Sequence, residues 1–290
     1  MTTSLIINAD DFGFSPGITD GIVAAHRQGI LTSTTLMTNM PDALRAIALA
    51  AENPSLGVGI HLGLTQGRPI TANLRSLVDG KGNFCRGLPT LLAKISISGR
   101  ARREVRKEWA AQIEFALAHK LVPTHLDSHK HVHHWPPLAK ITLELSRIYN
   151  IGFIRCAREV PIPGYRTTPA YTVLARLAAG LQPQILAAGL HTTDWFFGLS
   201  ATGNMSTQTW LTLLQHLPAG TGEVMVHPGN PVGLSQHQTR LVWQRTLEQH
   251  ALVDTAVKER CAALAVKLLH YGNCQGAASS AAQPPVKDVE

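Results

Sequence analysis

Cysteine is scarce in this sequence, and the four that occur, Cys85, Cys156, Cys261 and Cys274, lie far apart along the chain. No two of them form a CxxC pair, which argues against a zinc knuckle or a redox motif. We therefore expect reduced thiols and a functional site that is built from other residue types.

A hydrophobic run long enough to cross a membrane is also missing. The longest apolar region, residues 170–190, is broken by one arginine, two glutamines and a proline, whereas a spanning helix needs about 20 largely apolar residues. A buried strand over residues 5–9 leaves no room before it for a signal peptide. The sequence thus predicts a cytoplasmic protein without a membrane span.

Charge of one sign is not concentrated either, although the formal net charge is +7 and the isoelectric point is about 9.5. The densest basic run, residues 100–107, continues into a helical stretch in which Glu104, Glu108 and Glu114 are interleaved. Mixed signs of this kind are typical of a solvated helix face, with a phosphate or anionic-membrane contact as the alternative. We expect no nucleic-acid partner.

What the sequence does contain is an alternation of short apolar or β-branched runs with longer helical patterns, which is typical of parallel strands joined by crossover helices. A chain of 290 residues with 44% hydrophobic content can bury one substantial core. Strands are predicted over residues 4–9, 32–38, 56–62, 122–128, 152–157, 191–197 and 222–227. These runs indicate an α/β fold, a distorted (β/α) barrel of about seven parallel strands.

Helices are predicted between these strands. The first ends before Gly29, and the next ones cover residues 41–52, 102–119 and 136–149. Two more lie between residues 235 and 269. The Gly-rich segment 63–99 is expected to be an excursion over the barrel mouth. Residues 1–274 are predicted to form a single catalytic domain, and the Ala-, Ser- and Pro-rich residues 275–290 a disordered tail.

Two adjacent carboxylates, Asp10 and Asp11, follow the first predicted strand. In parallel α/β barrels the catalytic groups lie where strands end and loops begin. Like charges repel and unpaired buried charges are strongly disfavoured, so a cation would stabilise this pair. The alternative is that one aspartate caps the next helix while the other faces water.

Single histidines end two further apolar strands, His61 after residues 56–60 and His227 after residues 223–226. For each of them the alternative is a hydrogen-bonded structural histidine. The joint pattern favours a site, because separate strands deliver Asp or His at the same end of the predicted barrel.

The most polar strand is the fourth, where residues 123–134 read PTHLDSHKHVHH. With a side-chain period of two, His125, Asp127, His129 and His131 face one way. Along a regular strand His125 and His129 lie about 13 Å apart, too far to share one ion. We therefore expect His129, nearer the C-terminal end, to be a metal ligand, with His125 and Asp127 deeper and orienting the ligands.

His131 and His133 then either touch substrate or are exposed, and a histidine-rich surface tract is the alternative for the whole segment. One carboxylate and two imidazoles around an ion leave positions open for water and substrate, as a hydrolytic metal requires. The sequence therefore favours hydrolysis over a closed structural metal site.

At these residues the chain resembles the YdjC family of carbohydrate deacetylases, which includes the chitooligosaccharide deacetylases. The similarity lies in five blocks that follow one another between residue 4 and about residue 230. The blocks are NADDFG at 8–13, GILTSTT at 29–35, GIHL at 59–62, HLDSHKHVH at 125–133 and EVMVHP at 223–228.

The resemblance implies a barrel of the YdjC/NodB-like deacetylase fold and one divalent metal ion, magnesium or zinc, held by Asp11, His61 and His129. It also implies that Asp10 is the catalytic base and His227 the acid.

Arg155 and Glu159, after the fifth predicted strand, lie where family members carry polar groups near the pocket. Packing or a surface ion pair is the alternative for both. Together with His125, Asp127 and His131 they complete the set expected to support the ligands or contact substrate.

An enzyme of this kind removes the acetyl group from an N-acetylated amino sugar, such as the N-acetylglucosamine unit of an oligosaccharide or glycolipid. A metal-bound water attacks the amide, Asp10 takes a proton from it, and His227 protonates the departing nitrogen. The competing functions are a metal-dependent phosphoesterase, although no Gly-rich phosphate loop is present, and a sugar-binding protein without catalysis.

Two branches of the family share features with this chain. Residues 194–199, DWFFGL, are similar to the hopanoid-biosynthesis-associated branch, which acts on an N-acetylglucosaminyl hopanoid lipid, whereas residues 126–128, LDS, are similar to the chitooligosaccharide branch. For a lipid-linked substrate, residues 170–190 with the aromatic residues 195–197 would form an apolar surface for peripheral membrane contact, with core packing as the alternative. The natural sugar and assembly into a homo-oligomer stay open.

Overall fold

Parallel strands form the centre of the molecule. The computed structural model describes residues 3–85, 87–165, 168–234 and 239–274, so the predicted tail lies outside the described residues. The strands in the described part are β1 (Thr3–Phe12), β2 (Ser33–Leu36), β3 (Gly57–Leu62), β4 (Leu126–Ser128), β5 (Trp195–Phe197), β6 (Gly220–Val226) and β7 (Lys267–Leu269). All of their pairings are parallel, so their carboxyl ends lie at one edge of the sheet.

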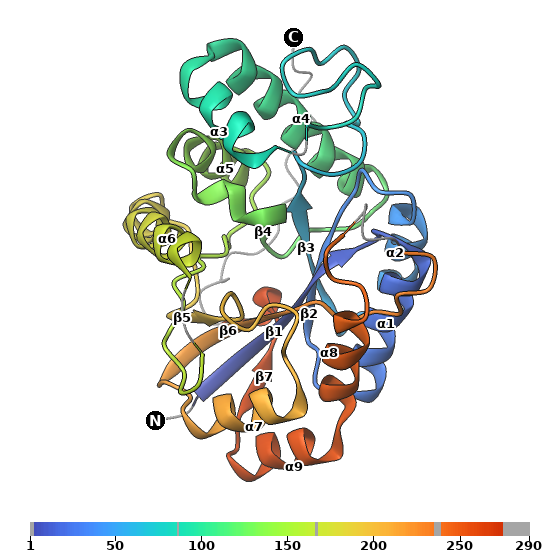
Figure 1. The fold of residues 1–290 in the computed structure, drawn as a ribbon, viewed down its shortest axis with the longest axis vertical. Coiled ribbons are helices and arrows are strands. Elements are labelled where there is room, and N and C mark those ends of the chain that lie inside the picture. Colours follow the sequence, from blue (N-terminus) through green and yellow to red (C-terminus); the bar gives the residue numbers. More distant parts are fainter. Residues whose placement is uncertain (1–2, 86, 166–167, 235–238, 275–290) are drawn as a thin grey trace.

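The long strand β1 lies in the middle of the sheet, whose order is β4-β3-β2-β1-β6-β5, and β7 also pairs with β1. Between β4 and β5 the sheet continues only through isolated bridges, which involve Phe153, Ile154, Glu159 and His191. The predicted barrel of parallel strands is confirmed, in the form of a half-barrel with one loosely joined side (Figure 1).

The fifth and sixth predicted strands are shorter than expected. Residues 152–157 pair with their neighbours only through two isolated bridges, Ile154 with Leu126 and Phe153 with His191. The next residue, Arg155, reaches Asp10 with its side chain. In the sixth, only Trp195–Phe197 is a strand.

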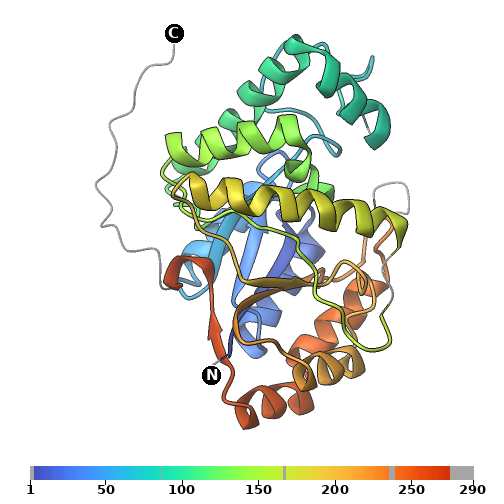
Figure 2. The ribbon, with the colours of Figure 1, turned by 90° about the vertical axis from the view of Figure 1, so that its left-hand side faces the viewer.

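Nine helices of the described residues surround the sheet, together with two short 3-10 helices, η1 (His129–His134) and η2 (Tyr271–Asn273). The α-helices are α1 (Pro16–Gln28), α2 (Ala43–Ala51), α3 (Leu88–Ile97), α4 (Gly99–Ala118), α5 (Pro136–Ile148), α6 (Pro169–Ala187), α7 (Thr207–Gln215), α8 (Gln244–Val253) and α9 (Thr255–Ala263). Helices α3 to α6 stack one on the next at the β4 side, whereas α1, α7, α8 and α9 form a second group at the opposite side (Figures 1 and 2). Ser15 caps α1, so helix capping by Asp10 or Asp11 is excluded.

The predicted excursion over residues 63–99 contains α3, and its loops are held by α4. Glu108 is 0% exposed and accepts hydrogen bonds from the backbone N–H groups of Ile70 and Thr71. The prediction of a solvated helix face is therefore wrong for Glu108. The loop covers that face, and its buried backbone donors need an acceptor.

The fourth strand ends earlier than the sequence pattern suggested. β4 stops at Ser128, and within η1 both Lys130 and His131 have a positive φ, of 59° and 55°. The predicted alternation beyond residue 128 is therefore wrong, because two left-handed residues break the period of two.

The aromatic residues 195–197 belong to the core. Trp195, Phe196 and Phe197 are at most 3% exposed, so they form no apolar surface for a membrane, and core packing holds for them. None of the described helices combines the length and the apolar character that a bilayer crossing requires.

Candidate functional site

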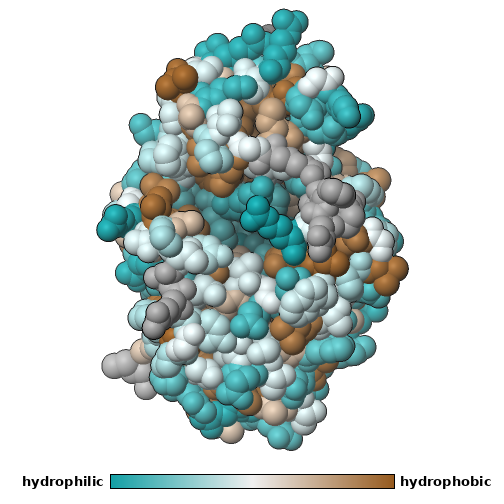
Figure 3. All heavy atoms as spheres, viewed as in Figure 1, coloured by the Kyte–Doolittle hydropathy of each residue, from teal (hydrophilic) through white to brown (hydrophobic). Residues whose placement is uncertain are grey.

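Polar side chains gather in one cavity at the carboxyl ends of the strands. The cavity has a volume of about 1040 Å³, and Figure 3 shows a hollow with hydrophilic side chains in the middle of this face. The predicted site residues that line it are Asp10, Asp11, His61, His129, His131 and His227. Separate parts of the chain thus reach one pocket.

An irregularity in β1 lets both adjacent carboxylates approach the same histidine. Neighbouring side chains of a regular strand point to opposite faces, but the register of β1 against β2 shifts between Ala9 and Phe12. Asp11 also has a φ of 72°, a strained value for a residue other than glycine. As a result, Asp10 Oδ2 and Asp11 Oδ1 lie 4.0 and 3.8 Å from Nε2 of His61.

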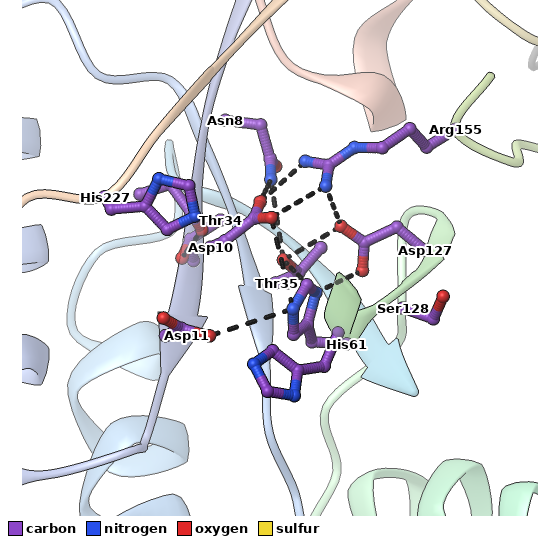
Figure 4. A network of polar contacts seen from close by, with 12 residues as sticks. Asn8, Asp10, Asp11, Thr34, Thr35, His61, Asp127, Ser128, Arg155 and His227 are labelled. Atoms are coloured by element: carbon purple, nitrogen blue, oxygen red, sulfur yellow. Dashed lines mark hydrogen bonds and ion pairs between the residues drawn. The ribbon is translucent and has the colours of Figure 1, made fainter. Parts of the chain in front are cut away.

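His61 itself is fixed by a buried carboxylate. Its Nδ1 lies 2.7 Å from Oδ1 of Asp127 and 3.2 Å from the hydroxyl of Thr35 (Figure 4). Burial alone would lower the pKa of His61, but the charges of Asp127 and Asp10 raise it to about 9. The carboxylates of Asp10 and Asp11 make the surroundings of Nε2 negative, so this side of His61 attracts a proton or another cation.

Arg155 is the centre of an ion-pair network beneath Asp10. Its guanidinium donates to both oxygens of Asp10, at 2.8 and 2.7 Å, to Glu223 at 2.8 Å, and lies 2.6 Å from Asp127. Burial by itself would raise the pKa of Asp10, but the charges of Arg155 and His61 hold it well below its ordinary value. Asp10 therefore stays ionised. A surface ion pair is excluded for Arg155, which is 0% exposed.

His129 directly follows β4, the sheet neighbour of β3, and its ring lies near that of His61. The two ring centroids are 5.9 Å apart, and Nδ1 of His129 lies 2.7 Å from the hydroxyl of Thr65. Burial lowers the pKa of His129 to about 3, with the charge of Asp11 opposing that shift. The imidazole is thus neutral and its second nitrogen is not engaged by Thr65.

Two charged residues of α8, Arg245 and Glu248, hold further parts of the site. Arg245 donates to Oδ2 of Asp11 at 2.5 Å. Glu248 accepts a 2.5 Å hydrogen bond from the backbone N–H of His227, and its carboxylate lies 4.0 Å from Nδ1 of that histidine. Among the described residues this Nδ1 atom has no hydrogen-bond partner.

The sequence interpretation missed both α8 residues, because charged side chains three positions apart on a helix usually form a solvated face. It also missed Glu223 and Tyr271. For Glu223 a signal was present, since a glutamate at the start of an otherwise apolar buried strand needs a buried partner.

Three of the predicted residues belong neither to the cavity lining nor to the ion-pair network around Arg155. His125 is buried under Tyr271, with ring centroids 3.8 Å apart. His133 is 0% exposed and bonded to a serine hydroxyl and a backbone carbonyl, so the prediction that it touches substrate or is exposed is wrong. Glu159 accepts hydrogen bonds from the backbone of the loop after β5.

The most compact group of candidate ligands differs from the predicted set. One ligand atom each of Asp10, His61 and Asp127 lie within 4.8 Å of one another. However, Asp127 is engaged by Nδ1 of His61 and by Arg155, and it is not among the described residues that line the cavity. Its position suits a group that orients His61 better than one that receives an ion from the cavity.

Comparison with known proteins identifies the family. The family model described as YdjC-like protein matches residues 4–263. The chain belongs to the YdjC family. The carbohydrate deacetylase of Geobacillus stearothermophilus is 34% identical over 272 residues, which cover 93% of this chain and 98% of that protein.

Two further comparisons cover nearly the whole chain. The chitooligosaccharide deacetylase of Yersinia enterocolitica is 32% identical over 278 residues, 94% of this chain and 100% of that protein. A crystal structure from Enterococcus faecalis V583, of a protein named for cellobiose-phosphate cleavage, has a TM-score of 0.74 at 30% identity and covers 93% of this chain and 98% of its own. The named deacetylases are hydrolases, and the enzyme class expected from the sequence is confirmed.

Proposed function

We propose that this YdjC-family protein is a divalent-metal-dependent deacetylase that removes the acetyl group from an N-acetylated amino sugar. The observation that carries the proposal is the placement of His61, whose Nδ1 is bound by Asp127 while its Nε2 faces Asp10 and Asp11 in the cavity. A carboxylate on the far nitrogen is the usual support of a metal-binding histidine.

The distances around Nε2 fit a shared ion. Two atoms that each lie about 2.1 Å from one cation are at most about 4.2 Å apart, and Asp11 Oδ1 lies 3.8 Å from Nε2 of His61. This separation is too long for a hydrogen bond. His129 is the third ligand of the proposal, since Thr65 fixes its Nδ1 and its ring neighbours that of His61.

The charge of the network supports a divalent cation. Four carboxylates, Asp11 and the three around Arg155, face only two guanidiniums, those of Arg155 and Arg245, so the network has an excess of two negative charges once His61 has lost its proton. Two imidazoles and one carboxylate suit zinc or a related transition ion better than magnesium, which prefers oxygen ligands. Of the two ions expected from the sequence, we therefore propose zinc.

An ion bound there would polarise the acetyl carbonyl and lower the pKa of a water beside it. Asp10, kept ionised by Arg155, takes the proton from the attacking water, because a carboxylate that accepts two hydrogen bonds from Arg155 and one from Asn8 retains a free lone pair. His227 lines the same cavity and protonates the departing sugar nitrogen. This division gives each residue a separate proton to move.

The size and lining of the cavity bear on the substrate. A volume of about 1040 Å³ is at the upper end of the range for small-molecule sites, roughly 300–1,000 Å³, and leaves space for a group attached to the amino sugar. Tyr171, Val173, Leu174 and Leu177 of α6 form an apolar wall of the cavity. We propose an N-acetylglucosamine unit as the reacting group, carried by an oligosaccharide or by a lipid that contacts this wall.

The decisive experiment loads chelator-treated protein with zinc or magnesium and supplies N-acetylglucosamine, its oligomers and a glycolipid that carries the same sugar. We expect free amine and acetate in equal amounts only with a divalent ion. Phosphate release from a phosphate monoester in place of acetate would instead indicate a phosphoesterase. Binding of the sugars without hydrolysis under every ion would indicate a sugar-binding protein.

Two variants test the division of roles. Asp10→Asn should retain the metal but lower kcat by about 10² to 10⁴-fold, the usual contribution of a general base. His129→Ala should lose the metal itself. The exposed ion-pair residue Asp20 provides a control, because Asp20→Asn makes the same chemical change outside the cavity. An Asp10→Asn enzyme with normal turnover would refute the base assignment.

A further inference from the structure

A chain of buried polar groups leads from the cavity to the floor of the half-barrel. It begins at Asp10, continues through Arg155 to Oε1 of Glu223 at 2.8 Å, and ends at the hydroxyl of Tyr271, which donates to Oε2 of Glu223. These four side chains are between 0 and 3% exposed. Every contact in the chain is therefore made without competition from water.

Tyr271 reaches this position from the C-terminal part of the chain. It begins η2, directly after β7, which pairs with the first residues of β1. Its ring is stacked on His125 and packs in a small apolar cluster with Ile6 and Phe153. Tyr271 also lies beyond residue 263, where the match to the YdjC family model ends.

Neither Glu223 nor Tyr271 is among the described residues that line the cavity. A substrate in the cavity would meet Asp10, while Arg155 separates Asp10 from Glu223. Any influence of Tyr271 on turnover must therefore pass through Glu223 and Arg155 rather than through substrate contact.

The chemistry of the buried carboxylate explains why the hydroxyl matters. Burial raises the pKa of Glu223, and Arg155 and Tyr271 oppose this shift. Burial also raises the pKa of Tyr271 well above its ordinary value, so its hydroxyl remains a donor. Without that hydroxyl, Oε2 of Glu223 would lose a buried hydrogen bond, and the pairing of Glu223 with Arg155 would change.

We propose that Tyr271 is a positioning residue of the active site, which acts through Glu223 and Arg155 to set the orientation of the Asp10 carboxylate. This inference rests on the proposed function, because it assigns Tyr271 a role in turnover through the catalytic base. It makes the segment after β7 part of the catalytic apparatus.

The test is Tyr271→Phe in the metal-loaded enzyme, with amine release from an N-acetylglucosamine oligomer as the assay. We expect kcat to fall about tenfold, the lower end of the effect of losing an outer partner of an active-site group, while KM and bound metal stay unchanged. Tyr165→Phe is the matched control, because the Tyr165 hydroxyl makes a comparable hydrogen bond, 2.6 Å from Oγ1 of Thr209, outside the network.

Glu223→Gln gives a second, independent measurement, and it carries the test if Tyr271→Phe does not fold. We expect its kcat to fall by about 10 to 100-fold. Because Tyr271 acts through Glu223, the double variant should be no slower than Glu223→Gln alone.

Three results would overturn the inference: wild-type kcat in Tyr271→Phe, a loss that appears only in KM or in bound metal, or strictly multiplicative effects in the double variant. Each of these presupposes an active wild type. Wild-type protein that deacetylates nothing under any ion would instead overturn the proposed function, and this inference with it.

Discussion

The two histidines proposed as ligands of one ion are held by different regions of the molecule. His61 is part of β3, a regular strand that pairs with β2 and β4, and its Nδ1 is bound to the carboxylate of Asp127. His129 begins η1 after the three-residue strand β4, and its Nδ1 is bound to the hydroxyl of Thr65. His61 is buried and His129 is partly buried, and one partner is charged while the other is neutral.

The difference in partner produces opposite protonation. Carboxylates raise the pKa of His61 to about 9 against the effect of burial, whereas burial lowers the pKa of His129 to about 3. At neutral pH His129 is ready to bind a metal ion, but His61 must first lose a proton. Burial alone therefore does not decide how a histidine ligand behaves; the charge of its support does.

The largest effect is expected from removal of either ring. His61→Ala and His129→Ala should both abolish metal binding and activity, as measured by metal content and amine release. Only His61→Ala takes a hydrogen-bond partner from a buried carboxylate, because Oδ1 of Asp127 loses Nδ1 of His61 while Oδ2 keeps Arg155; this loss should cost about 1–3 kcal/mol of stability. Equal melting temperatures of the two variants would contradict the proposed contrast between the two supports.

Substitution of Asp127, the partner of His61, should lower zinc affinity more than substitution of Thr65, the partner of His129. Asp127→Asn removes the charge behind His61 and should weaken zinc binding by about 10 to 100-fold, whereas Thr65→Val removes only a neutral hydrogen bond of His129 and should weaken it less. Competition titration with a zinc-binding dye measures both. A larger loss in Thr65→Val would reverse the order of importance assigned here.

The pH dependence should report His61 alone. Below pH 9 each bound ion displaces one proton from His61, so apparent affinity should rise about tenfold per pH unit between pH 7 and 9. The protonated His61 also stabilises the metal-free fold, fully below pH 6.5 and progressively less as the pH rises through 9, because its folded pKa is the higher one. In Asp127→Asn the slope of affinity against pH should flatten, and an unchanged slope would contradict the assignment of the proton to His61.

The smallest effect is expected in helices α4 and α5 on the β4 side of the sheet, away from the cavity. Lys120, just after α4, is exposed and has a φ of 64°, so Lys120→Gly should raise stability by about 0.5 kcal/mol. Lys140→Gly, in the middle of the exposed face of α5, is the control and should lower stability by about 1 kcal/mol. Thermal unfolding of both variants checks this; destabilisation by Lys120→Gly would contradict it.

The sequence predicted the regular half of the molecule well. The strands that became β1, β3 and β6 are mostly apolar, and each delivers Asp or His at the same edge, so Asp10, Asp11, His61 and His227 were found from pattern alone. The strand that became β2 is instead a short β-branched run, STTL.

The irregular half was predicted less well for a physical reason. A period of two cannot anticipate the left-handed pair Lys130 and His131, nor a strand that shrinks to single bridges at Phe153 and Ile154. The supports from α8 and η2 were missed because Arg245 lies 234 residues from Asp11 and Tyr271 lies 48 residues from Glu223, and a single sequence carries no signal of such contacts.

One divalent ion is proposed to bind on the Nε2 side of His61. Anomalous diffraction from zinc-soaked crystals, recorded on both sides of the zinc absorption edge, would locate this ion. We expect one strong peak within bonding distance of His61 Nε2, Asp11 and His129. A peak on the Nδ1 side, between Asp10, His61 and Asp127, or no peak near His61 at all, would contradict it.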